Sequence, residues 1–418
     1  MMKGYVKRFA DQILHKRLCS SGAVLIQGAK GCGKTETAIQ VAKSVARFDV
    51  DNEIRIRMEV DPKSILTGPV PRLIDEWQEY PQIWNYVRHE VDDRKEKGQF
   101  ILTGSANPEE RVKLHSGAGR FSILKMRPMS FFEMGWSTGE VSLSSLIKGQ
   151  VPKSEQVDFS LEALAEKLTF GGWPSLLETG SRDALRFMQD YIQLLAETDM
   201  SRVSGKKRDP QKVMRLLQSL ARNIATEVSV TSLAKDTSGS DVMITDETIA
   251  EYLDTLERLM ALEQLPTWKP HIRSSDTLRK APKRHFVDPS LAIGALGLSI
   301  DKLLADLNYF GLLFESLVIR DLRIYAEVHD GKVFHYRDSG NMETDAIIEY
   351  PDNTWAAFEI KMGFSAQDEA AGNLLKFAGK INQEKMGKPA SLTVITANGF
   401  ACRRQDGVNV IPLPVLTA

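Results

Sequence analysis

The chain has 418 residues, 42% apolar and 26% charged, a size and balance that predict a globular protein of two or three domains. A formal net charge of −1 excludes a general attraction to nucleic acid, so any such contact requires a local basic patch. Three widely separated cysteines, Cys19, Cys32 and Cys402, form no metal-ligand pair and favour a reducing compartment. The sequence offers neither a signal peptide nor a long apolar run, which predicts a cytoplasmic protein without a membrane partner.

A phosphate-binding loop is predicted at residues 28–35, where the sequence reads GAKGCGKT and fits the Walker A pattern G-x-x-x-x-G-K-[ST]. The apolar residues 23–26 predict a strand before it, and residues 37–42 begin a helix pattern after it, which is the context the loop requires. Backbone N–H groups and the helix N-terminus favour the ATP phosphates; Lys34 is expected on the β- and γ-phosphates and Thr35 in the Mg²⁺ shell. The expected nucleotide-binding residues of the loop are Gly28, Gly31, Cys32, Gly33, Lys34 and Thr35.

A second motif, RLIDEWQ at residues 72–78, has the Walker B form of a short apolar strand ending in Asp75 and Glu76. Asp75 is expected to reach Mg²⁺ through its water shell, and Glu76 to polarise the water that attacks the γ-phosphate. An acidic helix cap is the alternative interpretation. The preceding phosphate loop favours Walker B.

A third strand is predicted at residues 100–102, and it ends in the polar run TGSAN. Thr103 or Ser105 is expected to lie beside the Walker B strand and sense the γ-phosphate, with a plain turn as the alternative. The turn GAGR then presents Arg120, which suits charge on a transferring phosphoryl group when supplied by a neighbouring subunit of a homo-oligomer. The alternative is a surface arginine. Strands alternating with helices predict an open parallel sheet with ATP at the carboxyl ends of its strands.

Five stretches of the sequence, taken in order, resemble those of prokaryotic AAA-like ATPases of the AAA+ superfamily that carry a C-terminal domain of unassigned function. These stretches are GAKGCGKT, RLIDEWQ, FILTGS, GAGR and MRPMSFFEMG. The resemblance runs through the whole chain. It implies an α/β protein with an AAA-type P-loop ATPase domain at residues 1–140 and a linker and helical lid at 141–205. A winged-helix-like region at 206–300 and a restriction-endonuclease-like, PD-(D/E)XK-like domain at 301–418 would follow.

In the middle of the chain, residues 142–152 are polar and predict a linker, and residues 161–168 and 185–200 predict helices. Trp173, in a turn between these helices, is expected in the core. Three further helices are predicted at residues 213–221, 231–235 and 245–262, the last beginning at Thr245 in a pattern like a capping box.

Two strands, at residues 264–268 and 284–287, are then predicted to flank a basic loop. Its cationic residues are Lys269, Arg273, Arg279, Lys280 and Lys283, with His271 nearby. Three helices and a basic hairpin fit a winged helix-turn-helix, and its wing suits contacts to DNA phosphates. A solvated charged face and a protein-contact module are the alternatives.

The C-terminal region predicts the element order α-β-β-β-α-β, with Glu315 on its first helix. The order is carried by residues 309–325, 333–337, 344–348, 355–358, 368–382 and 392–396. Asp345 and the sequence Glu359-Ile360-Lys361 fit the D…(D/E)-x-K pattern of restriction-like nucleases. Alternation along a strand places Glu359 and Lys361 on one face toward Asp345, where the carboxylates would hold Mg²⁺ and the lysine would help activate water. Glu315 would be an outer participant. The alternative is a buried salt bridge or an exposed ladder.

The leading hypothesis is therefore an ATP-binding, Mg²⁺-dependent ATPase whose nucleotide state controls a DNA-directed and nuclease-like C-terminal domain. The alternative from another class is a nucleotide-switched module that binds protein or nucleic acid, with Asp345, Glu359 and Lys361 in a structural ion pair. A small-molecule kinase would use the same loop, but it leaves the basic wing and the C-terminal domain unexplained.

Overall fold

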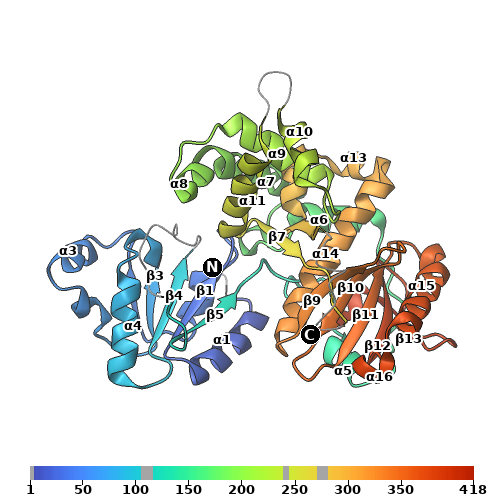
Figure 1. Ribbon diagram of the computed structural model, residues 1–418, viewed down its shortest axis with the longest axis horizontal. Coiled ribbons are helices and arrows are strands. Elements are labelled where there is room, and N and C mark those ends of the chain that lie inside the picture. The colour runs from blue at the N-terminus through green and yellow to red at the C-terminus, as the bar shows by residue number, and fades with distance from the viewer. Residues whose placement is uncertain (1–3, 105–115, 239–243, 271–280) are drawn as a thin grey trace.

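The computed structural model describes residues 4–104, 116–238, 244–270 and 281–418. An N-terminal α/β region and a C-terminal α/β region lie on opposite sides of the molecule, and a helical region lies between and above them (Figure 1). Within the described residues, no helix combines the length and the apolar character that crossing a membrane requires.

The N-terminal region is built on a sheet with the strand order β2-β3-β4-β1-β5, and all of its strand pairs are parallel. Its strands are β1 (Ala23–Gln27), β2 (Ser44–Arg47), β3 (Arg72–Asp75), β4 (Phe100–Gly104) and β5 (Phe121–Lys125). Its helices are α1 (Phe9–Ser20), α2 (Lys34–Ile39), α3 (Asn52–Val60) and α4 (Ile83–Arg94). The open parallel sheet predicted from the sequence is confirmed. Because β4 lies between β1 and β3, the phosphate loop, Walker B and the end of β4 meet at one edge.

The helix after the phosphate loop is shorter than predicted. It ends at Ile39, and the chain reaches β2 at Ser44, where Lys43 N donates to Pro71 O at 2.8 Å. Pairing of β2 with β3 thus ends the helical pattern early.

The polar segment predicted as a linker at residues 142–152 carries structure instead. Strand β6 (Val141–Ser142) is followed directly by helix α5 (Leu143–Ile147), in which Leu143 and Leu146 are buried. The Ser142 hydroxyl caps this helix by accepting from Ser145 N at 3.0 Å. The prediction failed because two leucines in a polar stretch suffice to dock one helical turn; α5 lies beneath the C-terminal sheet (Figure 1).

The helical region begins with α6 (Leu161–Phe170) and α7 (Ser181–Leu194), continues through a π-helical turn (Leu195–Asp199) and reaches α8 (Met200–Ser204). Trp173 is fully buried, as predicted, and its Nε1 donates to Ser290 Oγ at 2.9 Å. This indole therefore joins two segments of the core that are far apart in the sequence.

Three helices and an antiparallel hairpin follow in the predicted order. They are α9 (Pro210–Arg222), α10 (Val230–Ser238), α11 (Asp246–Arg258), β7 (Leu262–Leu265) and β8 (Lys283–Phe286). Thr245 caps α11 as predicted, since its hydroxyl accepts from Thr248 N at 3.3 Å. Residues 271–280 of the basic loop, and with them His271, Arg273, Arg279 and Lys280, lie outside the described residues. Helices α12 (Ser290–Leu296) and α13 (Ile300–Ala305) lead to the C-terminal region.

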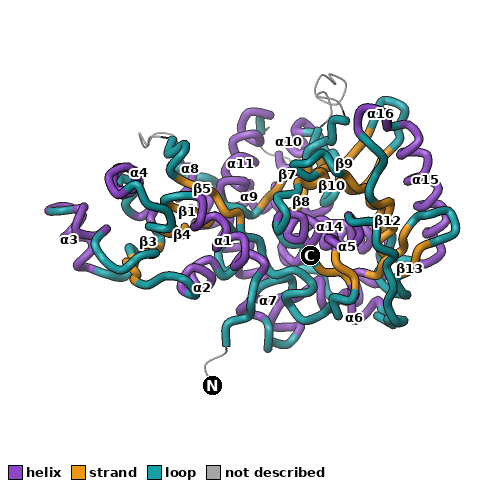
Figure 2. Tube along the Cα trace, turned by 90° about the horizontal axis from the view of Figure 1, so that it is seen from below, coloured by secondary structure: helices purple, strands orange, loops and turns teal. Residues whose placement is uncertain are grey.

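The C-terminal region contains a mixed sheet with the order β13-β14-β12-β11-β10-β9. Its strands lie on the opposite side of the molecule from β1, β3 and β4 (Figure 2). Its strands are β9 (Lys332–Arg337), β10 (Glu343–Glu349), β11 (Trp355–Ile360), β12 (Ser391–Thr396), β13 (Cys402–Arg403) and β14 (Asn409–Pro412). Its helices are α14 (Leu307–Glu327), α15 (Gln367–Lys380) and α16 (Gln383–Met386). Apart from the short helix α16 before β12, the order α14-β9-β10-β11-α15-β12 is the predicted one. The last strand, β15 (Leu416–Thr417), leaves this sheet and pairs with β6.

Candidate functional site

The phosphate loop has a backbone that only glycine adopts without strain. Gly31 and Gly33 have φ angles of 74° and 101°, in the left-handed region. At Gly28, a Cβ would lie 2.2 Å from Met126 O, so a side chain is excluded there as well. Cys32 is fully buried with its Sγ 3.6 Å from Met126 O. The loop is thus packed against the end of β5, and the glycine spacing of the motif has a structural cause in this chain.

Four side chains named from the sequence converge at the carboxyl ends of β1, β3 and β4. Lys34 is buried and its Nζ donates to Gly28 O and Ala29 O, each at 2.9 Å. The Asp75 carboxylate accepts from Thr35 Oγ1 at 2.8 Å and from Thr103 Oγ1 at 2.5 Å, both on Oδ1. The hydroxyl and carboxylate oxygens are hard donors of the kind that Mg²⁺ prefers, so this set fits the cation. Ser105, the other candidate on this strand, lies outside the described residues.

Glu76 follows Asp75 in a left-handed backbone conformation with φ of 52°. It lines a pocket of about 550 Å³ together with Lys34 and Thr35. Burial raises the pKa of Glu76, while hydrogen bonding from Gln78 Nε2 and the charge of Lys34 act in the opposite direction. A residue that is not glycine rarely adopts this conformation, and such strain is typical of functional positions.

The helical region contributes residues to this pocket that sequence reasoning missed. Arg202, on α8, lines it and lies 3.5 Å from Glu79 Oε1. Lys30 of the phosphate loop pairs with Asp199 of the π-helical turn at 2.5 Å. Nothing in the local sequence marks Arg202 or Asp199, because both lie far along the chain from the N-terminal residues with which they pair, Glu79 and Lys30. The π-helical turn is the one structural signal, since such turns are frequent at functional sites.

Arg120 lies at the opposite edge of the sheet. It immediately precedes β5, and Phe121 pairs with Ala23 at the amino end of β1. Its guanidinium pairs with Asp92 of α4 at 2.9 Å. Their hydrogen bond raises the pKa of Arg120 and lowers the pKa of Asp92, so each group favours the charged form of the other. Within one chain Arg120 is therefore remote from the phosphate loop, and its predicted role requires a neighbouring copy.

A second polar cluster lies in the C-terminal region. Lys361 Nζ is 3.0 Å from Glu359 Oε2 and 3.3 Å from Asp345 Oδ2, and Ile360 N donates to Asp345 Oδ2 at 2.8 Å. The pairing of Ala346 with Phe358 brings Asp345 and Glu359 to adjacent strand positions. The structure thus brings together the three residues of the sequence pattern, and they line a pocket of about 480 Å³.

Lys283 is the principal correction to the sequence analysis. The sequence predicts Lys283 in the basic loop between the two strands, but the residue is buried at the start of β8. Its Nζ lies 2.8 Å from Glu315 Oε1, 2.8 Å from Glu343 Oε1 and 4.0 Å from Asp345 Oδ1. Glu315, expected as an outer participant, therefore joins the cluster through a lysine from the neighbouring hairpin. A local run of positive charge gives no information about carboxylates that approach from α14 and β10.

The charges of this cluster are strongly coupled. Burial raises the pKa of Glu359 to about 8, with further repulsion from Asp345. Burial likewise raises the pKa of Glu315 to about 7. Burial opposes the charged form of Lys283, but the carboxylates of Glu315, Asp345 and Glu343 outweigh it and raise the pKa of that lysine. Each ammonium is thus held in its charged form by the carboxylates around it.

The carboxylate oxygens of Asp345 and Glu359 are chemically suited to Mg²⁺ and converge on one point, the Lys361 ammonium. Across the described parts of the chain, however, no group of three or more His, Cys, Asp or Glu side chains is arranged to hold a metal ion. The two lysines, not a cation site, neutralise the cluster in this conformation.

Residues 20–135 match the family profile of an AAA domain. Residues 161–302 and 310–416 match two domains of unknown function, DUF8612 and DUF4143. The match over the first region supports an AAA-like ATP-binding protein. Nuclease character of the C-terminal region is not part of these matches.

Among curated proteins, the chain is 24% identical over 360 residues to uncharacterized proteins of Mycobacterium bovis and Mycobacterium tuberculosis, covering 85% of this chain and 74% of each relative. Among solved structures it is similar to a Walker-type ATPase of Pyrococcus abyssi, with 11% identity, a TM-score of 0.42 and coverage of 71% of this chain and 99% of the other. It is also similar to RuvB of Thermotoga maritima, with 17% identity, a TM-score of 0.25 and coverage of 62% and 86%.

Proposed function

We propose that the chain is a Mg²⁺-dependent ATPase whose nucleotide state controls its C-terminal region. One observation carries the ATPase assignment: a single carboxylate oxygen of Asp75 accepts from Thr35 of the phosphate loop and from Thr103 of β4, next to the buried Lys34. This arrangement at the carboxyl edge of a parallel sheet supports metal-assisted hydrolysis of a nucleotide.

Each residue of the pocket has a separate role in the proposed hydrolysis of ATP. Lys34 would exchange its two carbonyl partners for the β- and γ-phosphate oxygens. Thr35 and Asp75 would hold Mg²⁺, which would supply charge neutralisation when bound. Glu76 accepts a hydrogen bond from the attacking water and orients it. Thr103 would sense the γ-phosphate through Asp75, and Arg202 lines the same pocket from the helical region.

The same contacts give the nucleotide a route to the rest of the chain. The pair between Lys30 and Asp199 joins the phosphate loop to the helices that follow. Closure of these helices over ATP would move the hairpin β7–β8, and β8 carries Lys283 into the C-terminal cluster. We propose that this cluster acts on DNA with Mg²⁺, and that Asp345, Glu359 and Lys361 form its nuclease-like site. The exposed Lys269 and the basic loop of a winged helix would contact the DNA phosphates.

A specific observation favours a second candidate. Lys361 and Lys283 already pair with the carboxylates, which is what a nucleotide-switched binding module with an inactive nuclease-like scaffold would show. In that case the C-terminal region recognises protein or nucleic acid without cutting it.

The ATPase assignment is tested by ATP turnover of Lys34→Ala beside Lys97→Ala, an exposed lysine of the same domain. Turnover should fall to background in the first variant and stay unchanged in the second. Unchanged turnover in Lys34→Ala would refute the assignment.

The two candidates for the C-terminal region are separated by incubating plasmid and linear DNA with Mg²⁺ or Mn²⁺, with and without ATP. Cleavage that disappears in Lys361→Ala supports the nuclease. A metal site would also show itself as a rise in melting temperature with Mg²⁺ or Mn²⁺ that Asp345→Asn abolishes. If there is neither cleavage nor such a rise, the result supports the binding module.

A further inference from the structure

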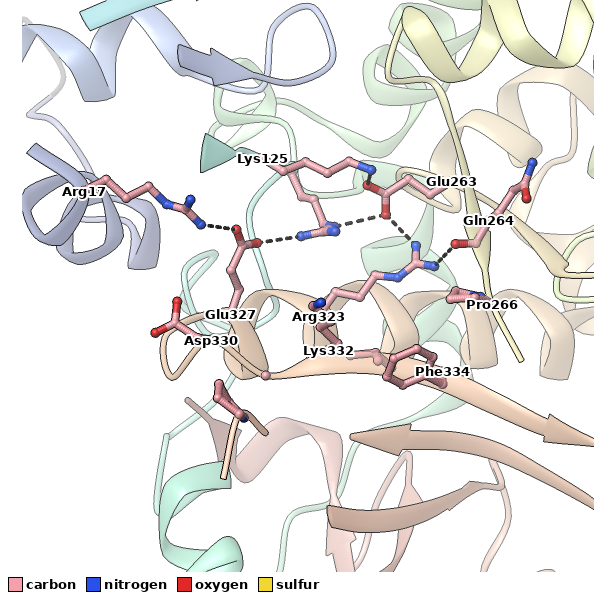
Figure 3. Close-up of a pocket in the computed structure, with 14 residues that line it drawn as sticks. Arg17, Lys125, Glu263, Gln264, Pro266, Arg323, Glu327, Asp330, Lys332 and Phe334 are labelled. Atoms are coloured by element: carbon pink, nitrogen blue, oxygen red, sulfur yellow. Dashed lines mark hydrogen bonds and ion pairs between the residues drawn. The ribbon is translucent and has the colours of Figure 1, made fainter. Parts of the chain in front are cut away.

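A separate pocket of about 570 Å³ opens where the three regions of the chain meet (Figure 3). Lys125 at the end of β5 forms one wall, Glu263 of β7 a second and Arg323 of α14 a third. Helix α1 adds Arg17. None of these residues lines the nucleotide pocket or the C-terminal cluster, so this is a site of its own.

The pocket carries more positive than negative charge. Four cations share the two carboxylates at its centre: Arg17, Lys125, Arg127 and Arg323 surround Glu263 and Glu327. Glu263 is almost fully buried and forms ion pairs with Lys125 at 2.7 Å, with Arg127 at 3.0 Å and with Arg323 at 2.5 Å (Figure 3). Lys332 and Asp330, which also line the pocket, cancel each other. The excess is therefore two positive charges.

Part of this excess is available to a ligand. The Lys125 side chain remains 41% exposed although it pairs with Glu263. Arg17 Nε is buried and has no hydrogen-bond partner among the described residues. Burial, and then the neighbouring charge of Arg127, lower the pKa of Arg323 to about 10 against the opposing effect of Glu263. An anion entering the pocket would relieve this repulsion between cations.

The remaining wall is apolar and suits a flat ring. Phe334, Val333, Pro266 and Pro351 line it beside the cations. The volume lies in the range of about 300–1,000 Å³ that small-molecule sites occupy. Guanidinium and ammonium groups next to an aromatic and proline surface are the features that recognise a phosphate attached to a ring.

We propose that this junction pocket binds a phosphate-bearing ligand of the size of a mononucleotide. The phosphate lies against Lys125, Arg17 and Lys332, and the ring lies against Phe334 and Pro266. A terminal nucleotide of a nucleic-acid strand offers the same phosphate chemistry and is the other possible source.

The Arg8 side chain connects this site to the phosphate loop. Arg8 donates through Nη2 to Arg127 O and through Nη1 to Cys32 O, each at 2.9 Å. Arg127 lines the junction pocket, so a ligand bound there lies beside a residue whose carbonyl is joined to the Walker A backbone through Arg8. This gives the pocket a physical connection to nucleotide hydrolysis.

The test uses the full chain carrying Lys34→Ala, so that the phosphate loop does not dominate the signal, and titrates AMP by calorimetry. Adding Lys125→Gln and Lys332→Gln should weaken AMP binding about tenfold or more, because charge-assisted contacts to the phosphate are lost. Lys97→Gln, the same charge change outside the pocket, should leave the affinity within about twofold. Adenosine should bind at least about tenfold more weakly than AMP.

A second arm titrates a short 5′-phosphorylated oligothymidylate. Binding of this strand that the pocket substitutions weaken, without AMP binding, identifies a strand end as the source of the phosphate and supports the site. If neither probe binds, or if the pocket substitutions weaken binding no more than Lys97→Gln does, the proposal is overturned. Lys332→Gln alone serves where the double variant melts early, because Lys332 is exposed.

Discussion

The nucleotide pocket and the C-terminal cluster use the same side-chain chemistry in opposite states. In the nucleotide pocket, backbone carbonyls hold Lys34 and hydroxyl groups satisfy Asp75. In the C-terminal cluster, Lys361 pairs directly with Asp345 and Glu359. A lysine held by carbonyls keeps its charge for an incoming phosphate, whereas a lysine paired with carboxylates must first be displaced by a cation. The first site is prepared for its ligand, and the second is closed by its own charges.

The largest expected effect concerns the prepared site. Asp75→Asn removes charge from the proposed Mg²⁺ position while the amide can still accept from Thr35 and Thr103, so folding should survive. We expect ATP turnover to fall by roughly 10- to 100-fold or more. Turnover at several Mg²⁺ concentrations checks this. Full activity would remove Asp75 from the site and with it the contrast between the two clusters.

The next largest effect is expected in the C-terminal cluster, at Lys283. Lys283→Met should destabilise the fold by about 3–5 kcal/mol, because Glu315 and Glu343 lose the buried ammonium that compensates them. Chemical denaturation of the full chain measures this. The double variant Lys283→Met/Glu315→Gln should recover part of the loss. A stability equal to that of the parent would mean that the carboxylates are neutralised in another way.

A smaller effect distinguishes the clusters by pH. The pKa of Glu359 is about 8 in the folded protein, against an ordinary value of 4.5. Between these values the unfolded chain loses a proton that the folded protein keeps, so metal-free protein should lose stability as pH rises through this interval and level off above it. We expect the melting temperature of Glu359→Gln to change less with pH than that of the parent. The two melting temperatures should be most alike at low pH, where Glu359 is protonated and neutral like glutamine. An unchanged profile would exclude Glu359 as the source; Glu315, with a pKa of about 7, contributes a slope of the same sign in both proteins.

The smallest structural effect is expected at Arg120. Its pair with Asp92 is exposed, so Arg120→Ala should leave the melting temperature nearly unchanged. If Arg120 serves a neighbouring copy, ATP turnover per chain should rise with protein concentration in the parent and stay low in the variant. Turnover that is flat down to clearly monomeric samples would refute the role.

The sequence was informative where function and contact are local. The glycine spacing at residues 28–35 and the apolar runs before Asp75 and Thr103 located the nucleotide pocket, because parallel strands bring their carboxyl ends together. The pairing of Asp345 with Lys361 followed from strand alternation in the same way.

It was misleading or silent where the partner is distant. Lys283 looked like part of a solvated basic loop because its partners, Glu315 and Glu343, approach from other elements. Arg202 had no motif to mark it, since only the packing of the helical region against the N-terminal sheet brings it to the pocket. Leu143 and Leu146 were too few to indicate a helix in a polar segment, yet both are buried.

The strand pair β6·β15 has a consequence for how the chain is assembled. Thr138 N donates to Pro414 O at 2.8 Å, and Ser137 Oγ donates to Leu416 O, 279 residues further along the chain, at 2.8 Å. Contacts of such long sequence separation form late, because the entropy of closing the intervening chain is lost before the contacts can stabilise the fold. During synthesis, residues 137–142 leave the ribosome well before their partner strand, and we expect the seam between them to close late in folding.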